Sequence, residues 1–248
     1  ATATALATRT AFALATPYCC LSEACRTKQF TANRPYRCTS DGCAARLERL
    51  AVTAAMTDVC NSSCDLRQIG SRYGDGGNGG SYAFPELRRA ISDALQEGPT
   101  ATYCETGFNL GHSSLLALQA FPNITVHAFD IGGPAPAVSA ACLRNTFGQR
   151  FHLHWGDSKV TVPAEALRCD VILIDGGHDS GVPAKDLANF RRHAAPGARL
   201  LMDDVHCKEP HCEEPSAAWD DAVTSGWVSE TGTGARSKYG YAVWGYAR

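Results

Sequence analysis

The sequence lacks the features of a membrane-spanning or nucleic-acid-binding protein. No apolar run approaches the roughly 18 residues that a helix needs to cross a bilayer. Lys and Arg total 23 against 25 Asp and Glu, giving a formal net charge of −2, and no basic patch is interleaved with aromatic residues. No overall positive field would therefore attract nucleic acid or an anionic membrane surface. We expect a chain with neither a membrane span nor a nucleic-acid partner.

The twelve cysteines lack the compact pairs of Cys-x-x-Cys knuckles that mark many zinc domains. Seven of them precede residue 65: Cys19, Cys20, Cys25, Cys38, Cys43, Cys60 and Cys64. This uneven use predicts a cysteine-rich extension over residues 1–65, cross-linked by disulfides in an oxidising compartment. Zinc remains the alternative, because the pairs Cys38/Cys43 and Cys60/Cys64 have usable ligand spacings.

Two further patterns concern the compartment. Asn61-Ser-Ser and Asn123-Ile-Thr are glycosylation sequons, and residues 1–16 are rich in Ala and Thr without an acid, as in the tail of a targeting segment. We expect the secretory-pathway lumen or the cell exterior, with a plastid as the alternative.

The chain after the extension divides into a glycine-dense stretch and a regular domain. Residues 66–83 form either a flexible linker or an active-site lid. Residues 84–248 alternate helix and strand patterns, which predicts an α/β fold: a doubly wound, mostly parallel, seven-stranded Rossmann-like sheet. Helices are expected at 44–59, 85–97, 113–120, 135–147, 182–194 and 216–225, and strands at 102–106, 124–129, 151–155, 170–174, 198–202, 227–231 and 239–246.

The most informative motif is the turn between the first strand and the helix that begins at Ser113. It reads Glu105-x-Gly107-x-x-x-Gly111, so backbone N–H groups at a helix N-terminus can face a nucleotide-like ligand. The third glycine of the dinucleotide fingerprint is missing, which disfavours NAD or FAD. Glu105 would repel a diphosphate but suits a cationic, amino-acid-bearing ligand.

Acids also follow the next two strands. Asp130 ends the second strand, where a carboxylate can accept hydrogen bonds from both hydroxyls of a ribose. Asp157 and Ser158 follow the third strand and are candidates to contact an adenine edge. The alternative for Asp157 is an ordinary turn residue after Gly156.

Asp175, Asp203 and Asp204 follow the fourth and fifth strands, whose ends are expected to be adjacent. Hard carboxylate oxygens at this density suit Mg²⁺, Mn²⁺ or Ca²⁺, and a cation would relieve their mutual repulsion. The alternative is that Asp203 or Asp204 only caps the next segment.

Two histidines lie near these acids in the sequence. His178 follows Asp175 by three residues and His206 follows Asp204 by two, so either can be a general base that removes a hydroxyl proton. His206 is favoured slightly, and His178 is alternatively a metal ligand or a structural residue of its turn. The other six histidines are interpreted as structural: His112, His127, His152, His154, His193 and His211.

The motifs occur in the order typical of a known family. Glu105-x-Gly-x-x-x-Gly-His-Ser, Phe129-Asp130, Asp170 to His178 and Leu200 to Asp204 together resemble the class I S-adenosylmethionine-dependent methyltransferases, in their metal-dependent O-methyltransferase branch. That branch includes catechol O-methyltransferase and the macrolide-sugar O-methyltransferases. The resemblance spans residues 84–248.

The resemblance implies methyl transfer from S-adenosylmethionine to a hydroxyl of a sugar, phenol or small metabolite, assisted by a divalent cation, most simply Mg²⁺. It implies cofactor contacts at Glu105, Gly107, Gly111, Ser113, Asp130 and Asp157, and metal ligands at Asp175, Asp203 and Asp204. His178 stands where the catechol enzyme has a lysine, whereas His206 matches a histidine of the sugar enzymes.

Two other functions remain open from the sequence. One is a metal-bearing enzyme of the same fold that does not methylate, for example a hydroxylase-like enzyme. The other is a non-catalytic binding module stapled by disulfides. The acceptor, whether small molecule or glycan, and the oligomeric state are not indicated by the residues.

Overall fold

A computed structural model describes residues 85–205, 207–231 and 240–244. The predicted extension 1–65, its helix 44–59, the loop 66–83 and His206 lie outside these residues. The described elements are α4 (Pro85–Glu97), β1 (Ala101–Thr106), α5 (His112–Ala120), β2 (Ile124–Asp130), α6 (Pro134–Phe147), η2 (Gly148–Arg150), β3 (Phe151–Trp155), α7 (Ser158–Ala164), β4 (Cys169–Ile174), α8 (Val182–Phe190), β5 (Ala194–Met202), η3 (Pro210–Cys212), α9 (Glu213–Thr224), β6 (Val228–Glu230) and β7 (Gly240–Trp244).

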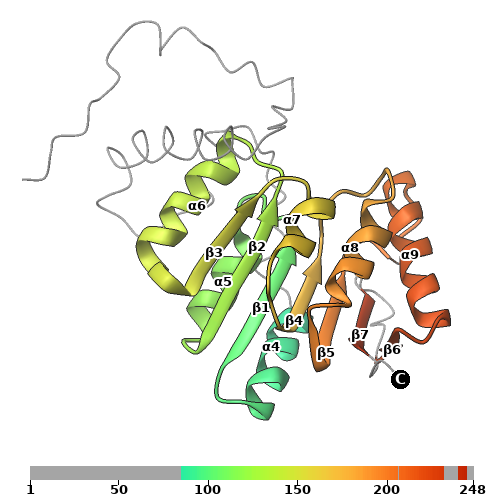
Figure 1. Ribbon diagram of the computed structural model, residues 1–248, viewed down its shortest axis with the longest axis horizontal. Coiled ribbons are helices and arrows are strands. Elements are labelled where there is room, and N and C mark those ends of the chain that lie inside the picture. The colour runs from blue at the N-terminus through green and yellow to red at the C-terminus, as the bar shows by residue number, and fades with distance from the viewer. Residues whose placement is uncertain (1–84, 206, 232–239, 245–248) are drawn as a thin grey trace, which may run out of the picture. The chain divides into compact units, whose positions relative to one another are not determined.

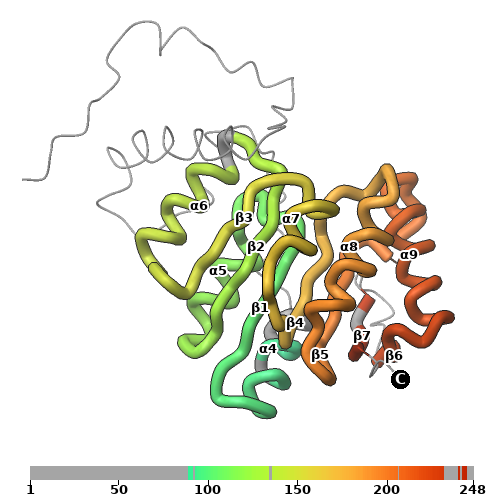
Figure 2. Tube along the Cα trace, viewed as in Figure 1, coloured from blue at the N-terminus to red at the C-terminus, as the bar shows by residue number. Residues whose placement is uncertain are grey.

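The strands form one seven-stranded sheet in the order β3-β2-β1-β4-β5-β7-β6. Strands β1 to β5 pair in parallel, and β7 is antiparallel to both β5 and β6. Figure 2 shows the chain moving from β1 outward to β3, then returning to β4 on the other side of β1. The order therefore reverses between β1 and β4, where open α/β sheets bind their ligands. The predicted fold class is confirmed.

Helices cover both faces of the sheet (Figure 1). The strand β4 shows why, since its successive apolar side chains point to opposite faces. Val171 and Leu173 pack in the core under α4, α5 and α6. Ile172 and Ile174 pack in a second core under α7, α8 and α9. A strand buried on both sides must be apolar throughout, as the run Val171–Ile174 is.

The clearest differences from the prediction lie at the α8–β5 connection and after β3. The helix expected at 182–194 ends at Phe190, because Cys169 donates its N–H to the His193 carbonyl and Cys169 pairs with Ala194, so β5 begins at Ala194. Helix α7 was not predicted, since the β-branched residues and Pro163 of Ser158–Ala164 disfavour a helix. Its N-terminus is stabilised by the Asp157 carboxylate, which accepts a hydrogen bond from the Lys159 N–H at 2.9 Å.

Two disulfides have both of their cysteines among the described residues. Cys104–Cys169 links neighbouring strands β1 and β4, and Cys207–Cys212 closes the loop before α9. Neither belongs to the predicted N-terminal framework, so the choice there between disulfides and zinc stays a prediction. None of the described helices has the length and apolarity to cross a membrane.

Candidate cofactor and metal site

The turn after β1 packs so closely on the start of the β4–α8 loop that it requires glycine. Gly107 has φ +84°, and a Cβ at this position would lie 1.6 Å from the Asp175 carbonyl oxygen. The Gly107 N–H donates to Phe129 O at 3.0 Å, and the Asp175 N–H donates to Thr106 O at 3.1 Å. These bonds hold the ends of β1, β2 and β4 together at one rim.

Gly111 ends the same turn and caps α5 in a left-handed conformation. A Cβ there would lie 2.4 Å from the Phe108 ring. Each glycine of the motif is thus required for a different steric reason. A side chain at Gly107 would collide with the backbone at the end of a neighbouring strand, and one at Gly111 would collide with the aromatic ring of the turn itself. The predicted strand–turn–helix is confirmed, while the cofactor role of its residues stays a prediction.

Glu105 lies beneath this turn and not on its surface. Its side chain is 0% exposed. It accepts hydrogen bonds from Ser113 Oγ and Ser114 Oγ, both at 2.5 Å, and from the Tyr103 hydroxyl. Burial raises the pKa of Glu105, and the three hydroxyls oppose that rise. Glu105 and Ser113 therefore join β1 to α5, so any effect of Glu105 on a cofactor would be exerted through the position of the turn.

Asp130 connects the second strand to the same turn. Its Oδ2 accepts the Asn109 N–H at 2.8 Å, and its Oδ1 accepts the Gly132 N–H at 2.7 Å. Each carboxylate oxygen can accept more than one hydrogen bond, so this fixed orientation leaves capacity for ribose hydroxyls.

Asp157 is the cap of α7, as described above, and its contact with adenine stays a prediction. Ser158 opens the same helix, and its hydroxyl faces the carboxyl group of Asp186, whose pKa it lowers.

Asp186 is a buried acid that was not predicted from the sequence. It is 0% exposed on α8, and neither carboxylate oxygen has a hydrogen bond of normal geometry. Burial raises its pKa to about 6, although the Ser158 and Thr106 hydroxyls oppose that shift. A signal was present, because Asp186 falls on the stripe of α8 that also buries Pro183, Leu187 and Phe190.

Asp186→Asn is expected to stabilise the protein at neutral pH. In the wild type, the unfolded state ionises from about pH 3.8 while the folded state holds its proton to about pH 6. The stability contributed by protonated Asp186 is therefore complete below pH 3.8 and is lost as pH rises through 6. Two pKa units correspond to about 3 kcal/mol, which is the largest gain expected for Asn at pH 7.

Urea unfolding between pH 4 and pH 8 measures this effect, with the exposed helical residue Asp220→Asn as the control. The control is expected to change stability by less than about 0.5 kcal/mol. A variant Asp186→Asn that is less stable than the wild type at pH 7 contradicts the assignment of a desolvated, poorly bonded carboxyl.

The ends of β4 and β5 bring acids and histidines together. His178 lies between two carboxylates, with Nδ1 3.4 Å from Asp204 Oδ2 and Nε2 3.9 Å from Asp175 Oδ1. Contact with Asp175 raises the pKa of His178, and the charges of Asp204 and Asp203 raise it further. Asp203 is buried, and its Oδ1 accepts the Asp204 N–H at 2.9 Å. Asp204 has a left-handed φ of 55°.

His211 lies beside the candidate metal ligand Asp204, which the sequence did not indicate. It was assigned a structural role, but its Nε2 lies 3.5 Å from Asp204 Oδ2 and its ring stacks on His178 with centroids 5.9 Å apart. The Cys207–Cys212 disulfide and the short helix η3 bring the residue back to the sheet end. The cysteine spacing around His211 was the signal available in the sequence.

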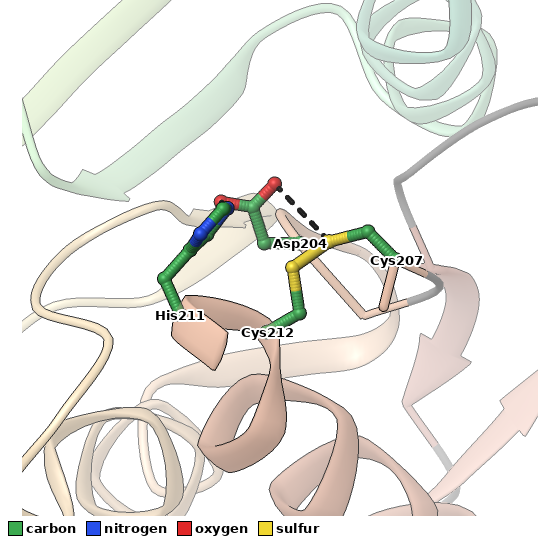
Figure 3. A group of neighbouring side chains, drawn as sticks. All are labelled: Asp204, Cys207, His211 and Cys212. Atoms are coloured by element: carbon green, nitrogen blue, oxygen red, sulfur yellow. Dashed lines mark hydrogen bonds and ion pairs between the residues drawn. A yellow bond between two sulfur atoms is a disulfide. The ribbon is translucent and has the colours of Figure 1, made fainter. Parts of the chain in front are cut away.

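One group of possible metal ligands converges in the described residues. Asp204, Cys207, His211 and Cys212 each offer one ligand atom within 4.8 Å of the others (Figure 3). Asp175 and Asp203 are not members of this group. The predicted metal set of Asp175, Asp203 and Asp204 therefore stays a prediction, as does the choice between His178 and His206 as the base.

Comparison with known proteins agrees with this architecture. Residues 104–205 match a family model described as a methyltransferase domain. The sequence matches no curated protein.

Three solved structures share the fold. A methyltransferase from Podospora anserina, bound to S-adenosylhomocysteine, is 12% identical with a TM-score of 0.57, over 84% of this chain and 97% of that one. An O-methyltransferase from Bacillus cereus, also with S-adenosylhomocysteine, is 14% identical with a TM-score of 0.55, over 80% and 100%. A TDP-rhamnose 3′-O-methyltransferase of calicheamicin biosynthesis is 17% identical with a TM-score of 0.53, over 84% and 97%. These structures confirm the methyltransferase fold, and residues 104–205 match a methyltransferase domain.

Proposed function

We propose, from the premise that residues 104–205 form a methyltransferase domain, that this chain transfers a methyl group from S-adenosylmethionine to a hydroxyl oxygen. The similar structures named above include two with S-adenosylhomocysteine, the product that methyl transfer leaves behind. One is named for methylating a sugar hydroxyl. A sugar, phenol or other small hydroxyl compound is accordingly the proposed acceptor class.

The observation that carries the proposal is the pair of acids around His178. Asp175 and Asp204 come from the ends of β4 and β5, on either side of one imidazole. The end of β4 borders the point where the strand order reverses between β1 and β4, and the end of β5 lies next to it. A reacting hydroxyl bound there would meet both carboxylate oxygens and a proton acceptor.

The chain's residues have distinct roles in this proposal. The N–H groups of the Gly107–Gly111 turn would orient the methyl donor, and Asp130 would accept hydrogen bonds from its ribose. The imidazole of His178 would take the proton of the acceptor hydroxyl. Holding donor and acceptor in line supplies much of the rate enhancement in such a displacement.

A divalent cation fits the donor set of this site. Asp175, Asp203 and Asp204 offer hard oxygen ligands, which Mg²⁺ and Mn²⁺ prefer. Such a cation, when bound, would lower the pKa of the acceptor hydroxyl. The same carboxylates without a cation are partly balanced by His178, whose pKa they raise.

Calorimetry and turnover together test the proposal. The chain is expected to bind S-adenosylhomocysteine, and to form it from S-adenosylmethionine only when a phenolic or sugar acceptor is present. Turnover should stop in excess chelator and return with Mg²⁺ or Mn²⁺. Asp130→Asn is the companion variant, expected to weaken cofactor binding by about tenfold through loss of one charge-assisted hydrogen bond, with the metal requirement unchanged.

The outcomes separate the alternatives. Full turnover in chelator removes the cation from the mechanism but leaves methyl transfer. Failure to bind S-adenosylhomocysteine contradicts the proposed function and favours a binding module. Cofactor and metal binding without methylation of any acceptor favours a different reaction at the same site.

A further inference from the structure

The loop between β5 and α9 carries four side chains that could bind a metal ion, and of these only Asp204 also belongs to the predicted hard-cation set. The ligand atoms of Asp204, Cys207, His211 and Cys212 all lie within 4.8 Å of one another. Cys207 Sγ is 3.8 Å from Asp204 Oδ1, and His211 Nε2 is 3.5 Å from Asp204 Oδ2. In Figure 3 the imidazole and the two sulfur atoms lie around the same carboxylate.

We infer that the reduced form of this loop binds zinc through Asp204, Cys207, His211 and Cys212. Two thiolates, one imidazole nitrogen and one carboxylate oxygen are ligand types that Zn²⁺ takes in tetrahedral sites. Soft thiolate ligands select zinc over Mg²⁺, which prefers oxygen alone. The site is thus chemically distinct from the proposed hard-cation site, although both use Asp204.

The inferred site needs a defined redox step. In the oxidised chain Cys207 and Cys212 share an S–S bond. A water-soluble phosphine breaks that bond, is itself oxidised to the phosphine oxide with the oxygen of one water molecule, and leaves two thiols. Zinc binding then displaces one proton from each thiol, since the thiolate is the ligand.

The distances suit closure around one ion. Zinc–ligand bonds of about 2.0–2.3 Å in a tetrahedron place ligand atoms roughly 3.3–3.8 Å apart. The four ligand atoms now lie within 4.8 Å of one another. Zinc binding therefore requires the two sulfurs to move apart after reduction, and otherwise only small side-chain movements. Cysteines five positions apart span one short turn, which η3 already folds.

Burial and access also support the site. Asp204 and Cys212 are buried, so their ligand atoms are positioned by the core. The His211 side chain is 53% exposed, which gives the ion a route from solvent. His178 contacts the same Asp204 oxygen as His211 and would orient that carboxylate, as outer groups do for metal ligands.

The zinc site and the hard-cation site would both use Asp204, so zinc is expected to affect turnover, an expectation that rests on the proposed function. A zinc ion held by the reduced loop would take Asp204 from the hard-cation site, so zinc is expected to inhibit methyl transfer by the reduced chain and not by the oxidised chain. Zinc binding itself is measured without any methyl acceptor, so failure of the zinc site and failure of the proposed function are distinguishable.

The test is zinc uptake by the full chain after reduction with the phosphine, measured by competition with a chromophoric chelator. Reduced wild type is expected to bind about one equivalent more than the double variant Cys207→Ser/Cys212→Ser, as one four-ligand site requires. His211→Ala should weaken this equivalent roughly a hundredfold by removing one of four ligands. Lys208→Ala, exposed in the same loop, is the matched control and should bind as the wild type does.

Cobalt in place of zinc gives a second readout. With Co²⁺ added, the reduced wild type should show the visible absorption of tetrahedral Co²⁺ and a thiolate charge-transfer band. Both bands should be absent when the spectrum of the metal-free serine double variant is subtracted from that of the same variant with Co²⁺. Equal zinc uptake by wild type and serine variant overturns the inference. Should the serine variant fail to fold, unchanged zinc affinity and cobalt spectrum in His211→Ala overturn it equally.

Discussion

Asp203→Asn is expected to lower kcat/KM for methyl transfer by about a hundredfold or more, because Lewis-acid stabilisation by a bound cation is worth several kcal/mol. The substitution keeps the shape of the side chain, and the amide oxygen can still accept the Asp204 N–H that Asp203 Oδ1 accepts now. The main change is therefore the loss of one negative charge at the predicted cation site. Affinity for S-adenosylhomocysteine should stay within about twofold, as Asp203 lies on a different strand end from the glycine turn.

Mn²⁺ binding followed by electron paramagnetic resonance checks the same variant without an acceptor. Its Mn²⁺ affinity should fall with its turnover. Asp179→Asn is the matched control, since Asp179 is an exposed acid in the loop after β4 and should leave both measurements unchanged. Wild-type Mn²⁺ affinity in Asp203→Asn contradicts the metal role of this residue.

Gly107→Ala is expected to have the largest effect on folding, a loss of at least about 4 kcal/mol in the free energy of unfolding, in the range reserved for severe steric faults. The new Cβ would lie 1.6 Å from the carbonyl oxygen of Asp175 and 2.5 Å from its carbonyl carbon. Both atoms are backbone, so relief requires the ends of β1 and β4 to move apart. Any variant that folds should also lose affinity for S-adenosylhomocysteine.

Gly148→Ala separates this collision from backbone strain. Gly148 also has a positive φ, of 55°, but a Cβ there would meet nothing within 4 Å. The expected loss is roughly 1–3 kcal/mol, the cost of holding an L-residue in a sparsely populated backbone region. Urea unfolding of both variants measures the difference, and equal losses would show that the contact with Asp175 is not what requires glycine.

Much of the sheet was predictable because its causes are local. The apolar run Val171–Ile174 and the similar runs of the other parallel strands predict burial on both faces, and the structure has them as β1 to β5. The turn at Gly107 and Gly111 was predictable for the same reason, since positive φ favours glycine wherever it occurs. Helix α7 was not, because its stability comes from the Asp157 cap and from packing of Val162, against weak intrinsic propensity.

The sequence by itself determined the succession of strands and helices, the glycine turn and the placement of acids at strand ends, because periodicity, turn chemistry and strand direction are written in neighbouring residues. Only the tertiary structure decided which of those acids is buried or paired. In the structure Glu105 accepts hydrogen bonds from three hydroxyls, Asp186 is buried on the inner face of α8, and His211 lies next to Asp204. Those relations depend on how turns, helices and strands pack against one another, and close packing between elements, which no local pattern records, fixes them.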